Sequence, residues 1–186
     1  MPGRDSLLLL LAIATIAVTP VRAEITHAAA NGFEVVVTTR IEASREAVWR
    51  GFVDEIARWW NPDHTVSGRA EGLYLDARTM GCFCELLGPD NGVVHMIVTL
   101  VDKPHMLRLT GGLGPLGLKG VAGNMTVEID EADGVSTVVL YYAVGGFHEA
   151  GLDSVAPAVD AVLGELLERL AEHVTDAAPE AQRSRP

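Results

Sequence analysis

The sequence predicts an α+β fold in which a curved antiparallel sheet of about seven strands wraps around one long C-terminal helix. Three observations lead to this prediction. An apolar stretch with helical periodicity lies near the C-terminus, and short strand-like stretches separated by turn residues precede it. Two short helical stretches follow the first strand. Because the links between the later strands are short, neighbouring strands are expected to pair antiparallel.

The C-terminal helix is expected over residues 155–174. Its large apolar side chains recur three or four residues apart, which places them on one stripe of a helix. These residues are Val155, Val159, Val162, Leu163, Leu166, Leu167, Leu170 and Val174. At 1.5 Å per residue the helix is roughly 30 Å long, about the width of a small domain. The rest of the domain is therefore expected to fold around it.

The preceding elements follow from local patterns. Apolar and polar residues alternate over 33–41, as in a strand with one buried face. Ser44 is a favourable N-cap for a helix through Val53, and a second helix is expected from Ile56 to Trp60. Residues 24–31 are expected to form a loose lead-in, and the polar segment 175–186 a disordered tail. The remaining strands are expected at Gly72–Arg78, Cys82–Leu87, Val93–Val101, Met106–Thr110, Val121–Asp130 and Val135–Val144.

Residues 1–23 have the layout of a signal peptide. Arg4 precedes an apolar run that begins at Leu7, and Val21-Arg22-Ala23 provides a cleavage site after Ala23. The run is shorter than the roughly 20 residues of a membrane-spanning helix. We therefore expect an exported protein, periplasmic or secreted, whose domain covers 24–174. An uncleaved N-terminal membrane anchor is the alternative.

Charge and composition narrow the classes of partner. The chain has 14 basic and 25 acidic residues, and removing 1–23 leaves 12 and 24, a net charge of −12. Such an acidic chain is a poor partner for nucleic acid or anionic membrane, and no stable membrane insertion of the mature chain is expected. The six histidines show no metal-ligand spacing, so neither a metal nor another cofactor is expected.

The only two cysteines are two residues apart. Cys82 and Cys84 lie in an expected strand, where their Cα atoms would be about 6.6 Å apart. That distance is close to the upper limit for a disulfide. Reduced thiols are therefore expected, with a disulfide as the alternative in an oxidising compartment.

Two stretches resemble a known superfamily. Residues 41–49 read IEASREAVW and residues 59–65 read WWNPDHT, and Leu107-Arg108-Leu109 and the C-terminal helix follow them. Over about 33–174 the chain resembles the START-like (SRPBCC) superfamily, which includes polyketide cyclases, pollen allergens and lipid-transfer domains. It is most similar to the branch of the heat-shock-ATPase activator. This resemblance implies a helix-grip fold with an apolar cavity between sheet and helix.

Several residues are candidates for binding a ligand in such a cavity. A glycine-rich segment from Gly111 carries Leu113 and Leu116, which suit the lip of a cavity but would equally pack on the core. Of the adjacent Trp59 and Trp60, one is expected in the core. The other either closes the cavity or meets the ligand, or helix packing alone explains the pair. Adjacent Tyr141 and Tyr142 lie on opposite faces of a strand, so only one points inward. The ligand-binding candidates are Trp60, Leu113, Leu116, Tyr141, Leu163 and Leu167.

Glu85 is the leading candidate for acid–base chemistry, and its orientation depends on the strand register. With Asn91-Gly92 as the hairpin loop, Glu85 pairs with Val98 and lies on the apolar face, where burial would raise its pKa. With Pro89-Asp90-Asn91 as the loop, Glu85 pairs with His95 on the outer face. The sequence leaves both registers open.

Three functions are considered. The first is binding of a hydrophobic small molecule, a lipid or a polycyclic aromatic, in an internal apolar cavity. The second is a cyclase- or dehydratase-like reaction with Glu85 as general acid–base, assisted by His64 or His95. The third is a protein-interaction role like that of the heat-shock-ATPase activator, against which the export signal argues. Binding is the function that the sequence favours.

Overall fold

The computed structural model describes the backbone of residues 20–183 and the side chains of residues 20–177. The predicted signal peptide, apart from its last residues, lies outside this range. Three 3₁₀ turns, η1 (Pro62–His64), η2 (Ala70–Gly72) and η3 (Gly114–Leu118), accompany the main elements. These are β1 (Arg22–Ala29), β2 (Gly32–Ile41), α1 (Arg45–Asp54), α2 (Ile56–Trp59), β3 (Leu73–Leu75), β4 (Cys82–Gly88), β5 (Asn91–Asp102), β6 (Met106–Thr110), β7 (Gly120–Ala132), β8 (Val135–Phe147) and α3 (Ala156–Arg183).

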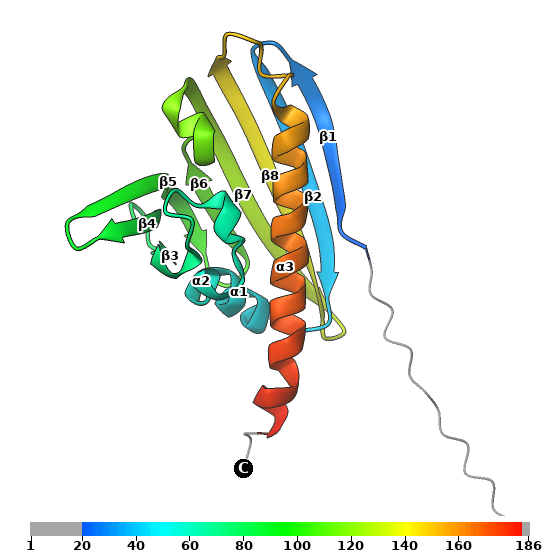
Figure 1. Ribbon diagram of the computed structural model, residues 1–186. Helices are drawn as coiled ribbons and strands as arrows, with labels where there is room; N and C mark the ends of the chain where they lie inside the picture. Colours follow the sequence, from blue (N-terminus) through cyan, green and yellow to red (C-terminus); the bar gives the residue numbers. More distant parts are fainter. Residues whose placement is uncertain (1–19, 184–186) are drawn as a thin grey trace, which may run out of the picture.

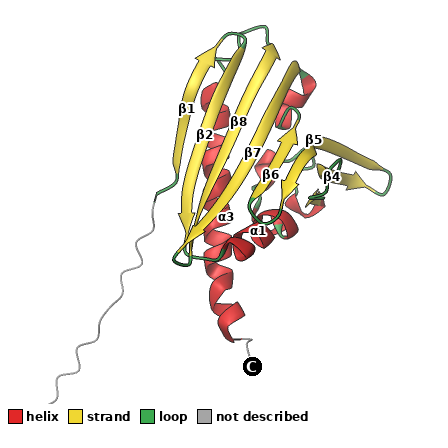
Figure 2. Ribbon diagram, turned by 180° about the vertical axis from the view of Figure 1, so that it is seen from behind, coloured by secondary structure: helices red, strands yellow, loops and turns green. Residues whose placement is uncertain are grey.

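The strands form one antiparallel sheet that curves around α3 (Figure 1). The strand order is β1-β2-β8-β7-β6-β5-β4-β3. Strands β3 to β8 form a meander, and the first two strands join it through the pairing of β2 with β8. Seen from behind, the sheet lies in front of α3, and the β4–β5 hairpin projects to one side (Figure 2). The predicted helix-grip fold is confirmed.

A row of inward-facing side chains crosses the sheet and forms the floor of the core. Val35 pairs with Tyr142, Tyr142 with Met125, Met125 with Leu109, and Leu109 with Val98. All five are buried. On the facing helix the later part of the predicted stripe is buried as well, with Leu163, Leu167 and Leu170 fully enclosed, whereas Val155, Val159 and Val162 are half-buried. Covering this row with α3 and the two short helices therefore contributes to the hydrophobic stabilisation of the fold.

The helices after β2 are placed by a cap and by a close approach. The Ser44 hydroxyl accepts a hydrogen bond from the Ala47 N–H at 3.3 Å and so begins α1 as predicted. Gly51 lies against α3, where an added Cβ would be 2.6 Å from a Val174 methyl. The Trp59 indole donates to the Gly51 carbonyl at 2.7 Å. These contacts fix α1 and α2 beside the end of α3.

The structure corrects two sequence predictions at the ends of the domain. The expected loose lead-in is the edge strand β1, which pairs with β2, so the sheet has eight strands rather than about seven. The sequence gives little indication of this strand, because Ile25 is its only large apolar residue and most of its side chains are exposed. At the other end α3 continues past Val174 to Arg183. Among the described residues, no helix combines the length and the apolar character that crossing a bilayer requires.

Candidate functional site

An apolar cavity of about 20 Å³ lies between the sheet and the helices. It has room for little more than one water molecule, and no polar side chain lines it. A larger hydrophobic molecule can occupy it only if side chains around it move. The lining residues come from α1, α2 and the residue that follows it, α3, five strands and the segment before η3. They are Phe52, Ile56, Trp60, Leu75, Phe83, Met96, Leu109, Leu113, Met125 and Leu166.

The structure brings only some of the predicted ligand-binding residues to this cavity. Trp60 and Leu113 line it, whereas Leu116 is buried without lining it. Leu163 and Leu167 are also buried but do not line the cavity; Leu166 is the helix residue that does. Neighbouring helix positions point about 100° apart, so a shift of one position along the helix decides whether a side chain lines the cavity or packs in the core.

The prediction that Tyr141 contacts the ligand was wrong, because its side chain does not face the cavity. It lies on the outer face with 42% of its surface exposed, while Tyr142 is buried on the inner face. The Tyr142 hydroxyl accepts a hydrogen bond from the Leu113 N–H at 3.0 Å and donates to the Gly111 carbonyl at 3.4 Å. Burial raises the pKa of Tyr142, which keeps it a neutral donor and acceptor.

The segment before η3 is thus hydrogen-bonded to Tyr142 through the backbone of Gly111 and Leu113. The ring can reach it because Gly123 lies beneath, where an added Cβ would be 2.6 Å from a Tyr142 ring carbon. The predicted lip of the cavity is therefore held by a buried side chain.

Glu85 and His95 meet inside the β4–β5 hairpin through a β-bulge. Phe83 pairs with Met96 and Cys84 with Val94, so His95 is the extra residue of β5. The bulge turns His95 inward beside Met96, and both are buried. The His95 Nε2 lies 3.1 Å from the Glu85 Oε2.

Neither register considered from the sequence is the observed one. The hairpin loop is Pro89-Asp90 between the paired Gly88 and Asn91, and Glu85 pairs with Val93. Glu85 is buried, as the first register required, yet it is next to His95, as the second required. A bulge shifts the pairing by one residue, and hydrophobic alternation does not reveal it.

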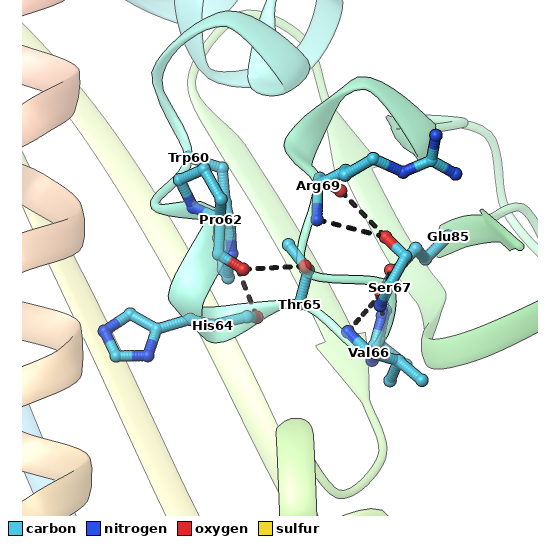
Figure 3. Close-up of polar contacts among 9 residues, drawn as sticks. Trp60, Pro62, His64, Thr65, Val66, Ser67, Arg69 and Glu85 are labelled. Carbon is cyan, nitrogen blue, oxygen red and sulfur yellow. Dashed lines mark hydrogen bonds and ion pairs between the residues drawn. The ribbon is translucent and has the colours of Figure 1, made fainter.

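The Glu85 carboxylate holds the segment that follows η1 (Figure 3). The Val66 N–H donates to Oε2 at 2.9 Å and the Ser67 N–H to Oε1 at 2.7 Å. Burial by itself would raise the pKa of Glu85, but hydrogen bonds from Ser67, Val66 and His95 outweigh it and hold the pKa below its usual value. The expectation of a raised pKa was wrong, because it considered the apolar surroundings and not these donors.

This arrangement makes Glu85 a positioning residue for residues 65–69. Its side chain has no exposed surface, both oxygens already accept hydrogen bonds, and it does not line the cavity. The Phe83 ring does line the cavity and packs against the His95 ring at 5.1 Å. Phe83 thus lines the cavity, whereas neither Glu85 nor His95 does.

His64, proposed as a partner of Glu85, instead contacts α3. Its Nε2 lies 3.1 Å from the Glu165 Oε2, and the Asn61 Nδ2 donates to the Glu165 Oε1 at 2.5 Å. The hydrogen bond with His64 lowers the pKa of Glu165, and burial raises it. The Asn61 hydrogen bond and the charge of Arg169 lower it further, so the pKa lies below its usual value. No local motif in the sequence indicates this contact, because Glu165 lies about a hundred residues from Asn61 and His64 along the chain.

Cys82 and Cys84 form a disulfide, with their Cα atoms 5.4 Å apart. The expectation of reduced thiols was therefore wrong. It rested on the 6.6 Å spacing of a regular strand, whereas the pairing of β4 shifts between Phe83 and Cys84. Among the described side chains, no three His, Cys, Asp or Glu residues gather as a metal site would require.

Comparisons with known proteins agree with this geometry. The family model described as polyketide cyclase/dehydrase and lipid transport matches residues 32–175. No curated protein matches the chain. Solved structures of similar fold include an uncharacterized protein from Rhizobium leguminosarum, with a TM-score of 0.58 and 16% identity over 84% of this chain and 98% of that one.

Two further structures show the same fold. A protein from Rhodobacter sphaeroides has a TM-score of 0.55 and 17% identity, covering 83% of this chain and 99% of its own. One from Chromobacterium violaceum has a TM-score of 0.54 and 18% identity, covering 76% and 96%. At these identities the structures support the fold, and the family model covers most of the chain. The chain belongs to the polyketide cyclase/dehydrase and lipid-transport family.

Proposed function

We propose that the protein is an exported carrier that binds one small hydrophobic molecule, a lipid or a polycyclic aromatic, in its internal cavity. The observation that carries the proposal is the wholly apolar wall of that cavity, placed between the sheet and α3. A ligand there gains free energy by removing its apolar surface from water. The family's lipid-transport description supports the same class of ligand.

The composition of the wall favours flat or flexible hydrocarbon ligands. Phe52, Trp60 and Phe83 present aromatic rings, and Met96 and Met125 present unbranched, polarizable side chains. Aromatic faces suit stacking against a polycycle, and methionines adapt to irregular shapes. Because the wall has no polar side chain, the part of the ligand that enters must itself be apolar.

Export remains part of the proposal. The Cys82–Cys84 disulfide supports it, since disulfides persist mainly in oxidising compartments. Acid–base catalysis, the second function considered, has less support. Glu85 is enclosed, both its oxygens already accept hydrogen bonds, and it does not line the cavity.

A titration with Nile red, an uncharged dye whose fluorescence rises in apolar surroundings, tests the proposal. We expect saturation near one dye per protein and displacement by fatty alcohols or polycyclic hydrocarbons. Met125→Trp should weaken dye binding at least about tenfold by filling the cavity. Leu86→Trp is the matched control, because Leu86 is 55% exposed. Equal losses in both variants, or no saturable binding by the wild type, would reject the proposal.

A further inference from the structure

Trp60 and Leu166 form a partition between the apolar cavity and a second, outer hollow. The outer hollow, of about 10 Å³, lies between α3 and the segment around η1. Trp60 and Leu166 are the two residues that line both hollows. Moving this pair apart would join the hollows into one channel. The other residues around the outer hollow are Trp59, Asn61, His64, Val162, Glu165 and Arg169.

Polar contacts across the outer hollow tie residues 59–64 to α3. Glu165 receives the Asn61 amide at 2.5 Å and contacts His64 at 3.1 Å, as described above. One turn along α3, the Arg169 Nε donates to the Trp59 carbonyl at 2.6 Å. The side chains of His64 and Glu165 are 31% and 37% exposed, so water can replace their contact at small cost.

The other end of the same segment is fixed in the interior. Val66 and Ser67 donate to Glu85, which is fully buried and would be costly to leave without partners. Trp60 moves with the segment, since its indole donates to the His64 carbonyl at 3.2 Å. Glu85 thus holds one end of this segment inside the protein, and Glu165 holds the other end at the surface of α3.

The alternative opening, at η3, is secured by buried groups. Tyr142, 1% exposed, holds Gly111 and Leu113, and Leu116 is 6% exposed. Opening there would break both hydrogen bonds of the buried Tyr142 side chain, whereas the latch contact joins His64 and Glu165 side chains that are 31% and 37% exposed.

We propose that residues 60–64 form a lid over the cavity, latched to α3 by Glu165 and secured at its far end by Glu85. The ligand passes between Trp60 and Leu166 when the latch opens. This proposal rests on the proposed function for its ligand. The lid itself is a property of the protein and can be measured without one.

Two measurements on Glu165→Ala, repeated on the isosteric Glu165→Gln, test the lid. In the first, the quenching of tryptophan fluorescence by acrylamide is compared with the wild type, whose Trp49, Trp59 and Trp60 are all buried. We expect stronger quenching, because an open lid exposes Trp60. In the second, bound Nile red is released into excess lipid vesicles, and we expect release at least about fivefold faster with unchanged stoichiometry.

Two controls accompany these variants. Glu168→Ala removes an exposed carboxylate from α3 without touching the latch, and Leu116→Ala loosens η3. Both should leave quenching and release near wild-type values. Faster release from Leu116→Ala alone would place the opening at η3 and overturn the lid. So would wild-type quenching and release in both Glu165 variants. Stronger quenching of the Glu165 variants in a protein that binds no dye would support the lid and reject the carrier function.

Discussion

At the scale of single residues, Glu85 shows how local donors decide the role of a buried acid. An apolar environment favours the neutral form, yet two backbone N–H groups and His95 converge on this carboxylate. Its pKa is therefore lowered, and the ionised group stabilises the fold. The same contacts place residues 65–69 and leave no oxygen free for a substrate.

Replacing Glu85 by glutamine tests this role. The amide carries one acceptor oxygen and turns an NH₂ donor toward a backbone donor, so Glu85→Gln should lower the free energy of unfolding at pH 7 by about 2–3 kcal/mol. A carboxyl whose folded pKa lies below the unfolded value near 4.3 stabilises above that pH and ceases to do so as the pH falls through the folded pKa. The difference should therefore be steady above about pH 5 and shrink below pH 4.

Urea unfolding of both proteins between pH 3 and 8 provides the measurement, and Glu168→Gln serves as the control for losing a surface charge. A Glu85→Gln protein more stable than the wild type at pH 7 would contradict the assigned role. That result would mean that burial outweighs the hydrogen bonds.

At the scale of elements, α3 and its strands were predictable because their signals are periodic. The stripe from Val155 to Val174 and the alternation over 33–41 each repeat several times, so one exception does not obscure them. Leu163 and Leu167 are buried as the stripe predicts. The weak strand β1 offers one large apolar residue, and nothing in its pattern distinguishes it from a loop.

Replacing Leu167 by alanine measures the grip of the sheet on α3. Leu167 has no exposed surface, so its truncation should cost about 2–5 kcal/mol of unfolding free energy. The neighbouring Glu168 is exposed, and Glu168→Ala should change stability by no more than about 0.5 kcal/mol. Denaturant titrations compare the two, and equal small losses would mean that α3 is not held by this face.

The site was less predictable than the elements, because it depends on register and on contacts distant in sequence. The sequence does not distinguish Tyr141 from Tyr142, because a shift of the strand register by one residue exchanges the tyrosine that faces inward. The bulge at His95 obeys no hydrophobic pattern. Asn61 and His64 contact Glu165, which lies about a hundred residues away in the sequence. No local sequence motif predicts such a contact.

At the scale of the whole molecule, the predicted cleavage site has a structural consequence. Cleavage after Ala23 would remove the pairs of Arg22 with Thr38 and of Ala23 with Val37, and would keep β1 from Glu24 onward. The edge strand would survive in the mature protein. We therefore expect the exported product to begin at Glu24, which N-terminal sequencing decides. A chain that begins at Met1 or Pro2 in the membrane fraction would indicate an anchor.

A ligand can enter the cavity only if the cavity enlarges. Its volume of about 20 Å³ in this structure is too small for a lipid or polycycle. Side chains on the lid and on α3 must therefore move, whereas the inner row of the sheet keeps its strand pairing. Ligand binding should accordingly change the surroundings of the cavity wall more than those of the outer face.

Methionine methyl NMR during a ligand titration tests the central claim most directly. The described methionines divide by position: Met96 and Met125 line the cavity, Met80 is 77% exposed, and Met106 lies outside the wall. With ¹³C-methyl methionine and a fatty alcohol or polycyclic ligand, the resonances of Met96 and Met125 should shift and saturate at one equivalent. Those of Met80 and Met106 should stay in place. Shifts of Met80 alone, or none at any ratio, would contradict an internal ligand site.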